Sequence, residues 1–193
     1  TQRIRGLFVT RNFFELLGIP FSLGRSFSES EENDSANALI LSSELWKSRY
    51  QQKPDIVGDS VDVYSWIIRP EHGLSRWQIV GIAGQEIPFL PVAVDALGDR
   101  FGINDQVQFW RPIGLYDELE RKERWEYTAI ARLNPGVTIE QARAEMATIS
   151  SHLADEYPEE NNNWSARVTP LNELVTSDIR PALQLLSGAV AFL

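Results

Sequence analysis

The sequence has 193 residues, 43% of them hydrophobic and 10% aromatic, which is enough apolar material for one large folded domain or two small ones. Its 27 acidic residues against 18 basic ones give a formal net charge of −9 without any basic run, which argues against a nucleic-acid partner. Cysteine is absent, which excludes disulfides, thiolate nucleophiles and cysteine-ligated metal centres.

The first fifty residues predict two units, each a strand followed by a helix. A strand over 3–10 precedes a helix over 11–17, and the apolar run at 38–41 precedes a second helix. Ser42 or Ser43 stands at the start of that second helix, where a hydroxyl oxygen can accept a hydrogen bond from a free backbone amide. This alternation of strand and helix indicates an α+β fold.

The middle of the chain predicts strands alone. Apolar runs at 57–68, 77–82 and 107–110 are separated by Gly and Pro turns, and no helix of ordinary length is predicted among them. A long irregular segment, 85–105, lies between the last two runs, and loops of this length usually carry function. We therefore predict a β-rich subdomain over 53–124, inserted into an α+β frame.

The most regular stretch of the sequence follows this middle part. Period-two alternation predicts a strand over 125–133, and Asn, Pro and Gly predict a turn over 134–136. Thr138 and Gln141 have the spacing of a capping box, and Pro158 ends the helix that this box begins. One apolar stripe recurs at helical spacing: Ile139, Ala142, Met146, Ile149, Leu153 and Tyr157. We expect this helix to pack back on the sheet that contains its preceding strand, so that the two form half of a split β-α-β unit, the unit from which the frame is built.

The C-terminal residues predict a last strand and an apolar helix. After a polar turn at 159–163, residues 165–171 alternate as a strand, and Pro181 suits the first turn of a helix. That helix continues as the uncharged run 182–193, which at about 1.5 Å per residue crosses only about half of a bilayer core of roughly 30 Å. On the residues alone, a core helix and the beginning of a membrane helix both stay open.

Candidate catalytic and metal-binding residues are few and scattered. His72 lies in a predicted turn and His152 on the main helix, so the two histidines form no paired-ligand pattern. The acidic run 29–34 lacks the alternating spacing of a calcium loop and is predicted to be a surface loop. Walker A, dinucleotide-binding and nucleophile-elbow motifs are absent. We predict no catalytic, cofactor-binding or metal-binding residues and no enzymatic activity.

Carboxylate pairs and tryptophans leave one rival open, a secreted carbohydrate-binding or hydrolase domain. Asp59 with Asp62, or Glu159 with Glu160, could serve glycoside hydrolysis, although spacing in a loop does not fix the separation in space. Six tryptophans could stack on sugar rings: Trp46, Trp66, Trp77, Trp110, Trp125 and Trp164. Most of them occupy inward positions of predicted strands, which favours packing in the core.

Several segments occur in an order that is typical of one family. They read VTRNFFELLGIPFSLGRSFSESE, ALILSSELWKSRYQ with IVGDSV, WQIVGIAG, ARLNPGVTIEQARAEM with LADEYPEENNNW, and RPALQLLSGAVAFL. In this set and order the chain resembles the extracytoplasmic, periplasmic core domain of MacB-type ABC transporter permeases, and most closely their branch with many acidobacterial members. The resemblance covers nearly the whole chain, except that 90–104 matches no part of the family pattern.

The resemblance implies a discontinuous frame, similar to the porter modules of tripartite efflux pumps, with a β-rich insert. Residues 1–52 would form the first half of the frame, 53–124 the insert, and 125–180 the second half. Residues 181–193 would then begin a truncated transmembrane helix.

The resemblance also implies a function without catalysis. The domain would lie on the periplasmic side of the cell inner membrane and transmit ATP-driven motion of a cytoplasmic ATPase subunit or domain through membrane helices outside this sequence. That motion would export a substrate or regulate a partner. Family members dimerise, so the implied partners are the ATPase, a second copy of the permease, and a periplasmic protein or cargo. No cofactor is implied.

Overall fold

A computed structural model of the chain describes residue 4 and residues 6–33, 37–64, 74–84, 107–113, 129–161 and 164–176. The chain divides into two units. The first comprises Thr1–Pro91 with Phe101–Glu118, and the second comprises Val92–Arg100 with Leu119–Leu193.

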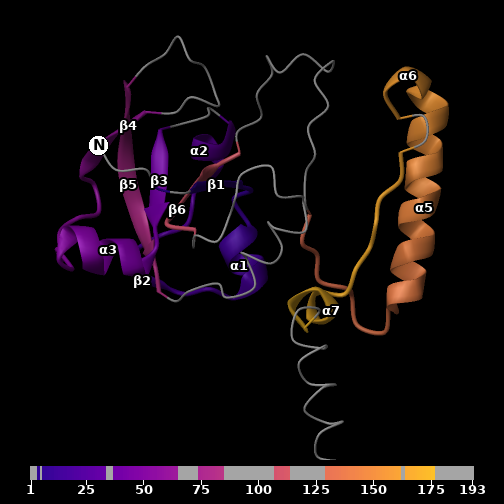
Figure 1. The fold of residues 1–193 in the computed structure, drawn as a ribbon, viewed down its shortest axis with the longest axis horizontal. Helices are drawn as coiled ribbons and strands as arrows, with labels where there is room; N and C mark the ends of the chain where they lie inside the picture. Colours follow the sequence, from indigo (N-terminus) through magenta and orange to yellow (C-terminus); the bar gives the residue numbers. More distant parts are fainter. Residues whose placement is uncertain are drawn as a thin grey trace, which may run out of the picture. The chain divides into compact units, whose positions relative to one another are not determined.

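The first unit contains one mixed sheet of six strands (Figure 1). The strands are β1 (Gly6–Val9), β2 (Phe21–Gly24), β3 (Ala38–Leu41), β4 (Ser60–Tyr64), β5 (Leu74–Ala83) and β6 (Phe109–Pro112). Their order is β1-β6-β3-β5-β2, and β4 pairs with β5 beside β2. The pairs β1–β6 and β3–β5 are parallel, whereas β2–β5, β3–β6 and β4–β5 are antiparallel.

Three helices lie in the described ranges of this unit: α1 (Phe13–Leu17), α2 (Glu29–Asn33) and α3 (Ser43–Tyr50). The predicted end of α1 is confirmed, because Gly18 adopts the left-handed conformation, with φ of 67°. The predicted cap of α3 is also confirmed, since the Ser42 hydroxyl accepts a hydrogen bond of 3.0 Å from the Leu45 amide. Helix α1 begins at Phe13 instead of at residue 11, and its N-cap is Asn12.

The two faces of the sheet bury different helices. Ile40 and Trp110 are register partners, and the ring of Trp110 lies 5.4 Å from that of Phe14 in α1. The next residue of β3, Leu41, belongs instead to a buried cluster with Leu45 of α3. Because successive side chains of a strand point to opposite faces, α1 and α3 cover opposite faces of the sheet. All four residues of β3 are buried, as expected of a central strand covered on both sides.

The acidic run that we predicted to be a loop is largely helical. Helix α2 occupies Glu29–Asn33 of the stretch 29–34. Ser28 and Glu31 form a capping box, in which the Glu31 amide donates to the Ser28 hydroxyl at 3.3 Å and the Ser28 amide donates to the Glu31 carboxylate at 2.6 Å. The Ser-x-x-Glu spacing was present in the sequence and was missed there.

The sheet combines strands from residues 1–52 with strands from residues 53–124, because β3 pairs with both β5 and β6. The α+β fold class is confirmed by this mixed sheet and its covering helices. The division into a frame and an insert stays a prediction.

The second unit is built around α5 (Ile139–Glu156), followed by α6 (Pro158–Asn161) and α7 (Leu171–Thr176). The predicted capping box is confirmed: the Thr138 amide donates to Gln141 Oε1 at 2.8 Å, and the Gln141 amide donates to Thr138 Oγ1 at 3.2 Å. The predicted turn before it is confirmed as well, since Gly136 has φ of 83° and the Val137 amide donates to the Asn134 carbonyl.

Two predicted strands of this unit are wrong in their described parts. Residues 129–133 and 164–170 are assigned to no strand. The second of these segments instead bonds to α5, because Arg143 Nε donates to the Val168 carbonyl and the Ala166 amide donates to the Ser150 hydroxyl, each at 3.1 Å. The predicted polar turn at 159–163 is helical at its beginning, where α6 lies.

The prediction of a membrane helix at 181–193 concerns residues outside the described ranges. None of the helices inside those ranges combines the length and the apolar character that a bilayer crossing requires.

Candidate functional site

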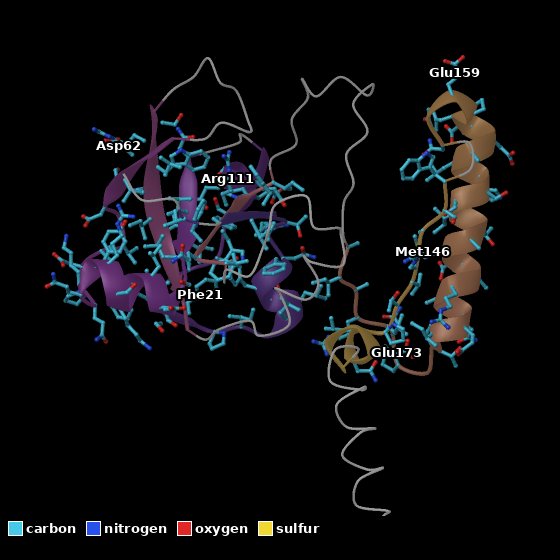
Figure 2. All side chains as sticks on the ribbon, in the orientation of Figure 1. Phe21, Asp62, Arg111, Met146, Glu159 and Glu173 are labelled. Carbon is cyan, nitrogen blue, oxygen red and sulfur yellow. The ribbon has the colours of Figure 1, made fainter. Side chains whose placement is uncertain are left out.

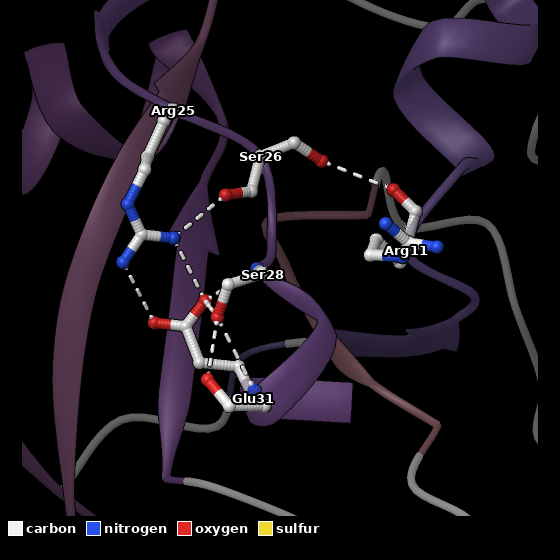
Figure 3. Close-up of polar contacts among 6 residues, drawn as sticks. Arg11, Arg25, Ser26, Ser28 and Glu31 are labelled. Carbon is white, nitrogen blue, oxygen red and sulfur yellow. Dashed lines mark hydrogen bonds and ion pairs between the residues drawn. The ribbon is translucent and has the colours of Figure 1, made fainter. Parts of the chain in front are cut away.

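Polar side chains of the first unit gather around the carboxylate of Glu31 on α2 (Figure 3). Arg25, which follows β2, donates from Nη1 at 2.8 Å and from Nη2 at 2.9 Å to the two carboxylate oxygens. Ser28 adds donors from its amide and its hydroxyl. Arg11 ties the preceding loop to the same region, because its carbonyl accepts from Ser26 and its amide donates to Glu32 at 2.8 Å. These contacts hold α2 to the loops beside β2 and α1.

The chemistry of this cluster is that of a fixed ion pair. The hydrogen bonds from Arg25, with further donation from Ser28, lower the pKa of Glu31 from 4.5 to about 2. The same contact raises the pKa of Arg25. A carboxylate that stays ionised at every physiological pH cannot act as a general acid, so the cluster is suited to holding structure and not to proton transfer.

Acid is expected to weaken the first unit through Glu31. Because its pKa is lower in the folded chain than in the unfolded one, the ion pair stabilises the fold above pH 4.5, and this stabilisation is lost as the pH falls from 4.5 towards 2. Solvent at the half-exposed Arg25 weakens the ion pair. With this weakening included, we expect a loss of about 2 kcal/mol in the free energy of unfolding. Urea titrations between pH 7 and pH 2.5 measure it.

The variant Glu31→Gln should show most of that loss already at pH 7 and a flatter pH dependence. Glu29→Gln is the matched control, because Glu29 is exposed on the same helix. Equal pH profiles for the wild type and Glu31→Gln would contradict the assignment.

An open depression of about 430 Å³ lies near this cluster, at the edge of β5. It is lined by Gly24, Arg25, Val57, Gly58, Gln78, Ile79 and Val80. Backbone groups along this edge are already bonded, since the Gly58 amide donates to the Ile79 carbonyl and the Arg25 amide donates to the Val80 carbonyl. Among the described lining residues, the one charged side chain is that of Arg25, which is held by Glu31. The depression therefore lacks the converging polar groups of a small-molecule site.

A second charged feature is buried in the sheet. Arg111 of β6, labelled in Figure 2, is 7% exposed. Its guanidinium carbon lies 4.5 Å from the ring centroid of Phe8 and 3.8 Å from that of Trp77. Two aromatic faces thus enclose one cation, an arrangement in which cation–π attraction is strongest because water is excluded.

The residues considered for catalysis are paired with basic side chains, exposed, or outside the described residues. Asp59 pairs with Lys53 at 2.6 Å, and Asp62 pairs with Arg76 at 3.3 Å. His152 is exposed on α5, and His72 lies outside the described residues. Glu159 is exposed on α6. In the described ranges, no three His, Asp or Glu side chains are grouped closely enough to hold a metal ion.

The tryptophans divide between core and surface. Trp77 and Trp110 are buried, as the preference for core packing predicted. Trp46 is half-buried and donates from its indole nitrogen to the Lys53 carbonyl at 3.0 Å, whereas Trp164 is 49% exposed. Trp66 and Trp125 lie outside the described residues.

The apolar stripe of α5 is not buried, so the prediction that this helix packs back on a sheet is wrong for the described residues. No residue of this helix is buried, and Ile149, Leu153 and Tyr157 are about 40% exposed. The segment 164–170 contacts one flank of the helix through Arg143 and Ser150. The described part of the second unit includes no sheet on which the stripe could pack.

Comparison with known proteins gives the family. Residues 1–149, more than half of the chain, match the family of the MacB-like periplasmic core domain. No curated protein sequence matches the chain.

Several solved structures are similar to the chain. Two of them are the periplasmic region of MacB from Actinobacillus actinomycetemcomitans, with 10% sequence identity and a TM-score of 0.47, and a domain described as part of a permease protein from Porphyromonas gingivalis, with 15% identity and a TM-score of 0.46. Each match covers 81% of this chain and 58% of the other, so the chain spans little more than half the length of these structures. On the family match over residues 1–149, the chain belongs to the family of MacB-like periplasmic core domains.

Proposed function

We propose that the chain is the extracytoplasmic domain of a MacB-like ABC transporter permease and that it couples ATP-driven motion of a separate nucleotide-binding partner to substrate export or partner regulation. The observation that carries this proposal is the family match over residues 1–149. A role without catalysis agrees with three carboxylates of the described residues, Glu31, Asp59 and Asp62, each of which is held in an ion pair with a basic side chain.

The partners follow from this role. The cytoplasmic ATPase subunit or domain would act through membrane helices on either side of the domain, in the cell inner membrane. The complete permease would be a homodimer, and a periplasmic protein or cargo would be the object of the motion. Within the family, we place the chain in the branch with many acidobacterial members.

In the proposed mechanism the frame couples rigidly to the membrane helices through its two ends. Motion would enter at two places, before Thr1 and at the junction of Arg180 with Pro181, where a membrane helix would begin. The surfaces over 53–124, including 85–105, would face cargo or partner. A sheet whose central strand is buried on both faces supports such a role, because close-packed interiors deform little under load.

A flexible insertion at the junction tests the coupling. Inserting about six Gly and Ser residues between Arg180 and Pro181 of the complete permease replaces a stiff connection with a flexible coil. We expect transport to be lost while ATP binding by the partner is retained. Transport into vesicles and nucleotide binding are measured on the same preparation.

The matched control places the same insertion between Pro135 and Gly136, an exposed turn in which added residues are tolerated. Transport should continue in this control. Retained transport with the junction insertion would count against the proposal.

A further inference from the structure

Strand β1 is attached to the sheet through β6, with which all four of its residues pair. It lies at one edge of the strand order, and β6 is its neighbour among the described strands. Strand β6 is in turn joined to β3 by two register pairs, Ile40 with Trp110 and Leu41 with Phe109, and by the Ser42 amide, which donates to the Gln108 carbonyl at 2.8 Å. The ladder alone therefore ties β1 loosely to the centre of the sheet, because edge strands with short ladders open first.

Side chains supply a second connection, which we call the Arg111 latch: Phe8 of β1, Arg111 of β6 and Trp77 of β5. Phe8 and Arg111 are register partners in the parallel β1–β6 pair. The Arg111 guanidinium is stacked against the Phe8 ring at 4.5 Å and against the Trp77 ring at 3.8 Å. Since β3 lies between β6 and β5 in the sheet, the latch joins the edge strand to a strand three positions away.

Burial gives the latch its strength. Arg111 and Trp77 are 7% and 4% exposed, so water competes little for the cation. The indole nitrogen of Trp77 is buried without a hydrogen-bond partner among the described residues, so this side chain contributes through its ring. A planar guanidinium can stack on two rings at once, which a lysine ammonium cannot.

We propose that Arg111 is a positioning residue that fixes β1 to β5 and transmits displacement of β1 to the centre of the sheet. The mechanical part of this inference rests on the proposed function, in which motion enters the domain ahead of β1. The structural part does not, because it concerns the attachment of β1 in the chain itself.

Hydrogen exchange on the 193-residue chain tests the attachment directly. The Ile113 amide donates to the Val9 carbonyl at 2.9 Å and reports on the β1–β6 pair. The Arg25 amide donates to the Val80 carbonyl at 3.1 Å and reports on β5 at the other edge. For Arg111→Met we expect protection of the Ile113 amide to fall about tenfold while that of the Arg25 amide stays unchanged.

Two further variants keep the test decisive. Arg111→Lys retains the charge but cannot stack on both rings. Its loss of hydrogen-exchange protection at the Ile113 amide should therefore be smaller than that of Arg111→Met. Phe8→Leu removes only the outer ring of the latch. Because Phe8 is 37% exposed, we expect this variant to fold even if Arg111→Met does not. Arg76→Met is the matched control, because Arg76 is an exposed arginine of β5 paired with Asp62.

An equal loss of protection at the Ile113 and Arg25 amides in Arg111→Met would overturn the inference, because it would show that Arg111 contributes only to the general stability of the unit. Unchanged exchange at Ile113 in both Arg111→Met and Phe8→Leu would also overturn it. The hydrogen-exchange experiment does not depend on transport activity, and the experiment with the insertion between Arg180 and Pro181 does not depend on the Arg111 latch. A failure of the Arg111 latch is therefore distinguishable from a failure of the proposed function.

Discussion

Replacing Trp110 with alanine is expected to unfold the first unit at moderate temperature. Trp110 is 2% exposed, and its ring lies edge-to-face against Phe14 at 5.4 Å. Its removal leaves a cavity between β6 and α1, and tryptophan-to-alanine changes in cores cost about 3–5 kcal/mol. That is a large share of the roughly 5–15 kcal/mol by which a domain is stable. Urea unfolding followed by tryptophan fluorescence and far-UV circular dichroism measures the effect.

Trp164→Ala is the control for this change. Trp164 is 49% exposed, so its removal should alter the free energy of unfolding by about 0.5 kcal/mol or less. A Trp110→Ala chain that unfolds at the urea concentration of the wild type would show that the α1 face of the sheet is not the core of the unit.

The second large effect is expected for Gly24→Ala, at the end of β2. Gly24 has φ of 72°, and a Cβ placed there would lie 2.2 Å from the Val80 carbonyl oxygen and 2.8 Å from the Gly81 Cα. Both neighbours are backbone atoms of the paired strand β5, so relief of the clash requires β2 to leave its register. We expect a loss of about 4 kcal/mol, of which the left-handed conformation accounts for about 1–2 kcal/mol.

Gly18→Ala separates the two contributions. Gly18 has φ of 67°, but a Cβ there would meet no atom within 4 Å. Its cost should therefore be the conformational one alone, about 1–2 kcal/mol. Thermal unfolding of both variants gives the comparison, and equal costs would show that the close approach of β2 to β5 is not tight.

Elements with local signals could be predicted from the sequence. Helix α5 has a capping box of its own, and the Ser42 cap and Gly18 stop use hydrogen bonds or backbone angles within a few residues. Helix α2 had a local signal too, the Ser28–Glu31 box, but it is only one turn long and its charges suggested a loop.

Features that depend on residues far away in the sequence could not be predicted. Period-two alternation over 125–133 and 165–171 describes a side-chain pattern, but a strand also needs a second strand to pair with. The described parts of these segments have no such paired strand. Arg111 gave no signal in the sequence, because its environment exists only when β6 lies between β1 and β3 and Trp77 follows on β5. The family resemblance came from the order of whole segments, and the match over residues 1–149 confirms the family, that of MacB-like periplasmic core domains.

The parallel pairing of β1 with β6 has a consequence for how the chain acquires its structure. Gly6 is in register with Phe109, so the pair joins residues about 100 positions apart. The entropy of closing so long a loop is lost before any contact of this pair forms, which makes such pairings slow. During synthesis β1 must therefore wait for β6 to emerge, and in that interval its unsatisfied backbone is open to mispairing with other chains.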